Sequence, residues 1–202
     1  HRIMKTNVKN TEDSSRKLSS GYRINEDADD AAGLCISETM RHQVRGLDRA
    51  SSNVQDGISM IQTADAALEE TQQILDRMVE LATQAANDIN TTADRTAIQD
   101  EVEQLKSEID HIAYDTNFNQ QYMLAEGTPK AKPGFFKIQA GSLADQSVTI
   151  NFVNASKESL GVADVDMTSY EGASESIAKI QNAIEIAATW SCLLYTSDAA
   201  DD

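Results

Sequence analysis

The residues best suited to acid–base chemistry are two adjacent carboxylates, Asp29 and Asp30. Two acidic groups held close together can act as a general acid and a general base. They are followed by Ala31-Ala32, and negative charge in the first turn of a helix is stabilised by the helix dipole. We therefore interpret the pair as the start of a helix rather than as catalytic groups.

Metal, cofactor and nucleophile patterns are absent from the sequence. The three histidines, His1, His42 and His111, have no second histidine or cysteine three or four residues away, and no His-Glu-x-x-His, Gly-x-Ser-x-Gly, Walker or dinucleotide glycine pattern occurs. Cys35 and Cys192 lack metal or redox spacing, and we expect Cys35 to be a small buried thiol. The sequence therefore predicts no catalytic residue, no metal site and no cofactor.

Long helices are the elements that must position any functional residue. Apolar residues recur in heptad-like steps at Met40, Val44, Leu47, Val54, Ile58, Ile61, Leu68, Leu75 and Met78, and again at Ile98, Val102, Leu105, Ile109 and Ile112. The first seam predicts a helix over about residues 39–87, roughly 70 Å long. The second predicts a helix over about 94–114. The polar turn between them, residues 87–92, indicates an antiparallel hairpin.

Shorter elements flank this helical rod, which we place at residues 21–126. Residues 1–20 suit a polar helix that ends at Gly21, and residues 173–191 suit the start of a last helix. Between them, residues 127–172 contain two strand-like runs, Phe135–Gln139 and Ser147–Phe152, which predict a β-hairpin. The predicted fold class is mainly α, a long antiparallel helical hairpin or coiled-coil rod with a small β-hairpin element.

The last eleven residues, 192–202, differ in composition from the helix before them and lose its period. They resemble the translation of a sequencing adapter, so we expect a non-native tail and exclude it from fold reasoning.

Composition excludes several classes of function. The 202 residues carry 33 acidic and 17 basic side chains, a net charge of −16, which would repel a nucleic-acid backbone. No window approaches the apolar length of a membrane span. We expect neither a nucleic-acid partner nor a membrane partner.

One segment is similar to the N-terminal signature of bacterial flagellins. It reads Leu18-Ser19-Ser20-Gly21-Tyr22-Arg23-Ile24-Asn25 and then Asp29-Asp30-Ala31-Ala32-Gly33-Leu34. The resemblance continues through Arg45-Gly46-Leu47, Asp56-Gly57-Ile58-Ser59 and Thr116-Asn117-Phe118-Asn119, and covers about residues 1–190. By this resemblance, the residues expected to serve subunit packing are Leu18, Ser19, Gly21, Arg23, Ile24, Asn25, Asp29, Asp30 and Gly33.

The resemblance implies a secreted structural subunit of the extracellular flagellar filament, which serves motility. The implied partners are other flagellin subunits in a homopolymer, the flagellar export machinery and a chaperone. Uncovered heptad seams fit such a polymer, because one heterologous contact repeated without closure builds a helical tube. We expect the helices at both ends to be incomplete.

The resemblance also implies innate immune recognition by a Toll-like receptor of a host. The matching receptor-binding residues are Arg77, Leu81, Gln84 and Glu101, the first three of which share one helical stripe. A structural interpretation stays open, with Leu81 in the core and Arg77 a solvated charge.

Two other functions remain alternatives. A hook–filament junction protein of the same superfamily would share the terminal helices. An enzyme built on a flagellin-like rod would need a catalytic insert, for which residues 155–172 are too short.

Overall fold

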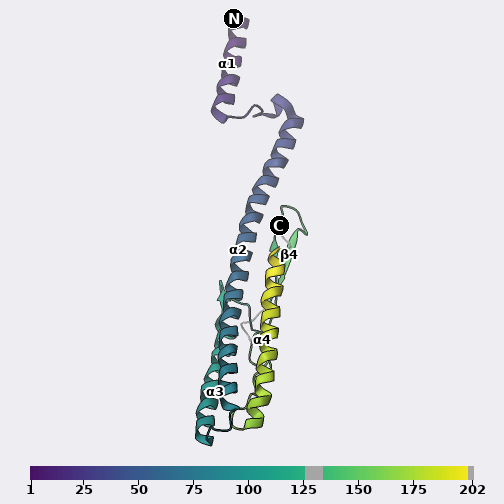
Figure 1. The fold of residues 1–202 in the computed structure, drawn as a ribbon. Helices are drawn as coiled ribbons and strands as arrows, with labels where there is room; N and C mark the ends of the chain where they lie inside the picture. Colours follow the sequence, from purple (N-terminus) through teal and green to yellow (C-terminus); the bar gives the residue numbers. More distant parts are fainter. Residues whose placement is uncertain (126–133, 200–202) are drawn as a thin grey trace. The chain divides into compact units, whose positions relative to one another are not determined.

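The computed structural model describes residues 1–125 and 134–199 and confirms a mainly helical fold with small antiparallel β elements. In chain order the elements are α1 (Arg2–Ser20), α2 (Asp27–Ala85), α3 (Thr92–Asp115), β1 (Asn117–Phe118), β2 (Gln121–Tyr122), β3 (Phe135–Gln139), β4 (Ser147–Asn151) and α4 (Tyr170–Ala199) (Figure 1). They divide into two compact units, which we describe separately. Unit 1 comprises His1–Ser51 with Ala140–Gln146, and unit 2 comprises Ser52–Gln139 with Ser147–Asp202.

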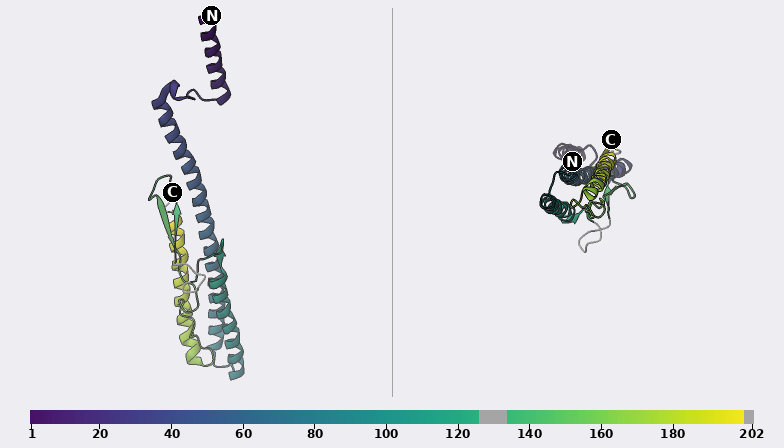
Figure 2. Two further views of the ribbon diagram at one scale, coloured as in Figure 1. Left: turned by 180° about the vertical axis from the view of Figure 1, so that it is seen from behind. Right: turned by 60° about the horizontal axis from the view of Figure 1, so that its bottom comes forward.

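In unit 2, α3 and α4 lie alongside the C-terminal part of α2, as both side views show (Figures 1 and 2). The predicted antiparallel hairpin of α2 and α3 is confirmed. A capping box starts α3: the Asp94 N–H donates to Thr91 Oγ1 over 3.3 Å, and the Thr91 N–H donates to Asp94 Oδ2 over 3.0 Å. Because these bonds satisfy free N–H groups of the first turn, α3 begins at Thr92 rather than near residue 94.

Two apolar clusters form the core of unit 2. The first joins α2, α3 and α4 through Leu75, Met78, Val102 and Ile180, all fully buried. The second joins α2, β4 and α4 through residues that include Leu68, Ile150 and Leu194. Ile61, Leu68, Leu75 and Met78 of the predicted seam are therefore core residues, whereas Val54 and Ile58 are half-buried.

The start of the predicted seam is not covered. Met40, Val44 and Leu47 of unit 1 are 58%, 56% and 52% exposed. The reason is length: α2 has 59 residues and α3 only 24, so a helix that folds back from the end of α2 reaches only its C-terminal part.

The predicted β-hairpin is confirmed as β3 and β4, which pair antiparallel with Phe135 opposite Asn151 and Gln139 opposite Ser147. The rings of Phe136 and Phe152 pack edge to face with centroids 5.5 Å apart. Gly57 of α2 lies where an added Cβ would collide with the Ile138 side chain, so this glycine lets the hairpin approach the helix closely. Pro129 and Pro133, which precede β3 in the chain, lie outside the described residues.

In unit 1, α1 buries no side chain and ends at Gly21, which has φ 72° and donates its N–H to the Lys17 carbonyl over 3.0 Å. This left-handed residue is the predicted C-cap. The helical stretch assigned to α2 begins at Asp27 instead of near residue 39 and is interrupted at Asp30, whose backbone is extended. Asp30 Oδ1 accepts the Gly33 N–H over 3.0 Å, so Asp30 caps the continuous helix instead of lying in its first turn.

At the other end, α4 starts at Tyr170, a little before the predicted residue 173, and continues through Cys192 to Ala199. Leu194 is 2% exposed and extends the buried series Ala183, Ala187 and Leu194. The prediction that the helical period is lost from Cys192 onward is therefore wrong for residues 192–194, where the helix and its buried face continue. Residues 200–202 lie outside the described residues, and the non-native origin of 192–202 stays a prediction.

Candidate interaction sites

The N-terminal part of α2 carries an exposed row of large apolar side chains, which we call the apolar stripe: Ile36, Met40, Val44 and Leu47. Steps of four, four and three residues place these side chains on one helix face. A groove in unit 1 runs beside them and is also lined by Tyr22 and Arg41. The Arg41 guanidinium lies 4.1 Å from the centre of the Tyr22 ring, a cation–π contact that fixes one wall of the groove.

Helix α1 also exposes its apolar side chains. Ile3, Met4, Val8 and Leu18 are between 52% and 84% exposed, and Met4 and Val8 line a second groove along the helix. Contiguous exposed apolar surface of this kind marks interaction sites in soluble proteins. The exposed apolar side chains of α1 and those of the apolar stripe therefore make unit 1 a candidate interaction site.

The predicted packing residues mostly shape the chain between α1 and α2. Besides the caps at Gly21 and Asp30, Asn25 donates from Nδ2 to the Tyr22 carbonyl over 3.2 Å. Gly33 lies where an added Cβ would come within 3.0 Å of Ile24, which is half-buried. The other members, Leu18, Ser19 and Arg23, are exposed, and the side chain of Asp29 lies outside the described residues.

All four predicted receptor-binding residues line a groove between α2 and α3. Arg77 donates from Nε and Nη2 to Glu101 Oε1 over 3.1 and 2.9 Å, and from Nη1 to Glu80 Oε2 over 2.9 Å. The hydrogen bond with Glu101, followed by that with Glu80, raises the pKa of Arg77. Leu81 lines the same groove but is only 2% exposed and belongs to the core.

Gln84, the fourth of these residues, has an exposed side chain on the same groove. Its carbonyl accepts from Asn90 Nδ2 over 2.5 Å, which ties the end of α2 to the following turn. The groove therefore carries Arg77, Glu101 and Gln84 at its surface, and Leu81 packs in the core beside them.

The prediction of a buried thiol at Cys35 is wrong, because this side chain is exposed. Of the apolar residues that the structure describes in unit 1, only Ala50 is buried, so the helix face that carries Cys35 has no cover. Cys192 is exposed as well.

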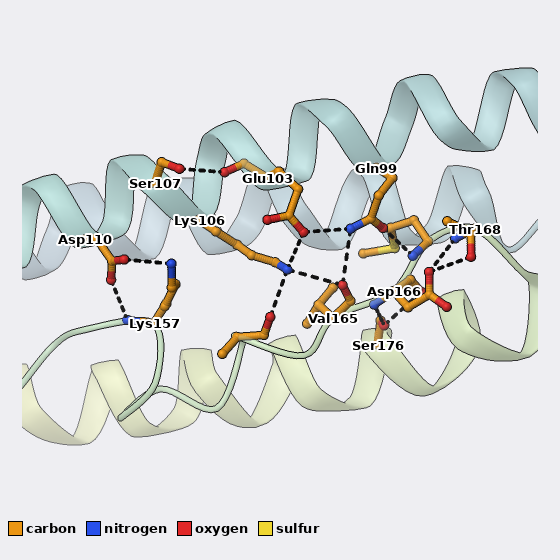
Figure 3. A network of polar contacts seen from close by, with 12 residues as sticks. Gln99, Glu103, Lys106, Ser107, Asp110, Lys157, Val165, Asp166, Thr168 and Ser176 are labelled. Atoms are coloured by element: carbon orange, nitrogen blue, oxygen red, sulfur yellow. Dashed lines mark hydrogen bonds and ion pairs between the residues drawn. The ribbon is translucent and has the colours of Figure 1, made fainter.

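Sequence reasoning missed a polar network between α3 and α4 (Figure 3). Lys106, 4% exposed, donates from Nζ to Glu103 over 2.7 Å and to the carbonyls of Ala163 and Val165 over 2.9 and 3.3 Å. The hydrogen bond from Lys106 is the main cause that lowers the pKa of Glu103. A signal was present, because polar residues 99, 103, 106 and 110 repeat the four-three-four spacing of the apolar seam beside them.

Metal-binding clusters and membrane-spanning helices are both absent from the described part of the chain. There, no three His, Cys, Asp or Glu side chains are grouped so that they could hold a metal ion. No helix within residues 1–125 and 134–199 has the length and apolar character needed to cross a membrane.

Comparison with known proteins gives consistent matches. The family described as the bacterial flagellin N-terminal helical region matches residues 1–128. A flagellin from Clostridium tyrobutyricum is 52% identical over 166 residues, and the match covers 81% of this chain and 44% of that protein. The "Flagellar filament 30.7 kDa core protein" of Treponema maltophilum is 37% identical over 194 residues, covering 91% of this chain and 68% of that protein.

A solved structure agrees with these sequences. The crystal structure of Bacillus cereus flagellin is similar with a TM-score of 0.63 and 34% identity, covering 72% of this chain and 82% of that chain. The chain spans less than half the length of its Clostridium relative.

Packed long helices, a small hairpin and exposed apolar helix faces define a mainly helical structural protein. Since the family match covers well over half of the residues and the relatives agree, the chain belongs to the bacterial flagellin family.

Proposed function

We propose that this chain is the helical part of a structural subunit of the bacterial flagellar filament, outside the cell, with no enzymatic activity. The observation that carries the proposal is the apolar stripe on α2, which is large, contiguous and uncovered within unit 1. The family membership and the filament name of the Treponema relative support the same function.

Self-assembly follows from the position of the stripe on a long helix. A long helix with an apolar face gains stability by packing against another helix, at about 1.5–3 kcal/mol for each large side chain that becomes fully buried. A contact between different faces of identical subunits repeats without closing and builds a helical polymer. Other copies of the subunit are therefore the main partners that we propose.

Export through the flagellar secretion machinery with a chaperone is part of the same proposal. A junction protein of the hook has less support, because the relatives reported above are a flagellin and a filament core protein.

Growth of filaments from a related full-length flagellin, such as that of Clostridium tyrobutyricum, tests the proposal. We expect the added chain to occupy filament ends and slow elongation. Val44→Asp should abolish this effect, since it places a charge in the apolar stripe. Ile89→Asp is the matched control, because Ile89 is an equally apolar side chain, 84% exposed in the turn before α3, that does not belong to the stripe. The proposal would be contradicted if the parent chain did not slow elongation, or if both variants slowed elongation equally.

We further propose that Arg77, Gln84 and Glu101 form a surface that binds a Toll-like receptor of a host. Leu81 packs beneath this surface and supports it. Arg77→Ala should lower receptor signalling with little change in thermal stability, because an exposed ion pair contributes only about 0–1 kcal/mol. Leu81→Ala should lower stability by about 2–5 kcal/mol, because it opens a cavity in the core. Unchanged signalling by the well-folded Arg77→Ala variant would leave these residues a purely structural role.

A further inference from the structure

Residues 157–168, which we call the strap, form an irregular segment between α3 and α4 (Figure 3). The strap contributes four buried apolar side chains to the first core cluster: Leu160, Val162, Val165 and Met167. A segment buried in this way must find partners for its main-chain polar groups outside regular secondary structure.

Side chains of α3 supply many of those partners. Lys106 donates to the carbonyls of Ala163 and Val165, as described above. The Met167 N–H donates to Gln99 Oε1 over 2.6 Å, and the Lys157 N–H donates to Asp110 Oδ1 over 3.2 Å. These contacts hold both ends of the strap and its middle against one face of α3.

The other side of the strap is bound to α4. Ser176, 1% exposed, accepts the Asp166 N–H over 3.1 Å and donates to the Asp166 carbonyl over 3.2 Å. Asp166 lies between Val165 and Met167, so α3 and α4 form hydrogen bonds to consecutive residues of the strap. The C-terminal half of α4 has a separate anchor, since Ser191 donates to Asp65 of α2 over 2.5 Å.

We propose that the strap is a latch, closed by Lys106, that holds the first turns of α4 against α3 and opens as one unit. Lys106 is the central residue because its ammonium donates at once to the buried Val165 carbonyl, the partly buried Ala163 carbonyl and Glu103. When it is lost, both carbonyls lose a donor in a place that water reaches poorly, which costs more than the loss of an exposed bond. This inference concerns the single chain and does not depend on assembly.

Hydrogen–deuterium exchange on the full chain tests the latch through Lys106→Met, which keeps the length and apolar stem of the side chain. We expect the amides of residues 157–168 and of the first turns of α4 to exchange roughly ten- to a hundredfold faster. Exchange in residues 68–85 of α2 should stay unchanged. Emission of Trp190, the only tryptophan, should also stay unchanged, because the second half of α4 remains docked.

Lys179→Met is the matched control, since Lys179 forms an exposed pair with Glu175 on α4 at 3.0 Å and should leave exchange in the strap unaltered. Ser176→Ala opens the latch from the other side with the loss of only one hydroxyl, and it should produce the same regional pattern. If Lys106→Met does not fold, exchange in the Ser176→Ala variant still tests whether the strap and the first turns of α4 open together. Unchanged exchange in the strap, or a uniform increase through α2, α3 and α4, would overturn the proposal.

Discussion

At the residue scale, single side chains and glycines decide where the helices begin and end. Gly21 adopts φ 72° at the end of α1, and Thr91 with Asp94 forms the capping box of α3. Each of these residues satisfies backbone groups that the helix itself leaves unpaired. Their replacement should therefore act on the adjoining helix and little elsewhere.

Gly21→Ala should shorten α1, because a Cβ in the left-handed region costs about 1 kcal/mol. Circular dichroism should show a loss of helicity. Gly21→Asn is the control, since asparagine tolerates this conformation and should retain most of the helix. Equal helicity of the parent and the alanine variant would show that Gly21 does not limit α1.

Asp94 gives the start of α3 a pH dependence. The hydrogen bond from the Thr91 side chain, and then that from the Thr91 backbone, lower the pKa of Asp94. Because the folded-state pKa lies below the unfolded value of about 3.9, the cap stabilises α3 above that pH. Its contribution is lost as pH falls through the folded-state pKa. Amide exchange in the first turn of α3 should rise over this acidic range, and Asp94→Asn should remove that dependence.

At the scale of elements, the helices differ in how much packing supports them. α1 buries no side chain, whereas α2, α3 and α4 share two apolar clusters. An isolated helix of 19 residues is only marginally stable in water, so α1 should open far more often than the others.

Limited proteolysis should therefore cleave within residues 1–20 before any site in α3, and mass spectrometry of the early products checks this expectation. The remaining fragment should keep the fold of unit 2, because no residue of α1 belongs to either apolar cluster. A first cut inside α3 would show that α1 is protected.

At the scale of the whole molecule, charge is distributed unevenly. Residues 1–51 hold nine basic and eight acidic side chains, whereas residues 52–202 hold eight basic and twenty-five acidic ones. The apolar stripe lies in the nearly neutral part. Copies of the chain that associate through this stripe still repel one another through their acidic part.

Binding of the chain to filament ends should consequently strengthen when NaCl is raised from about 50 mM to about 500 mM, since salt screens repulsion more than it weakens apolar contacts. Inhibition of elongation at the two concentrations measures this effect. Weaker inhibition at the higher concentration would indicate that attractive ion pairs, rather than apolar contacts, hold the subunit.

The sequence by itself determined the local features of this protein. The heptad seams specified the helical hairpin, alternation specified β3 and β4, and Gly21 specified a helix end, because these depend on periodicity and backbone preference. The signature residues also indicated the flagellin family. Periodicity predicted that part of a seam stays uncovered but not which part, and the expectation of a buried thiol at Cys35 was wrong.

Only the tertiary structure decided which surfaces remain open and how the irregular segment is held. The apolar stripe is exposed within unit 1, and in unit 2 Leu81 becomes core while Arg77 and Glu101 pair beside it. The bonds of Lys106 join residues more than fifty positions apart in the chain. Contacts over such a separation follow from how the helices pack, which the local pattern of residues does not encode.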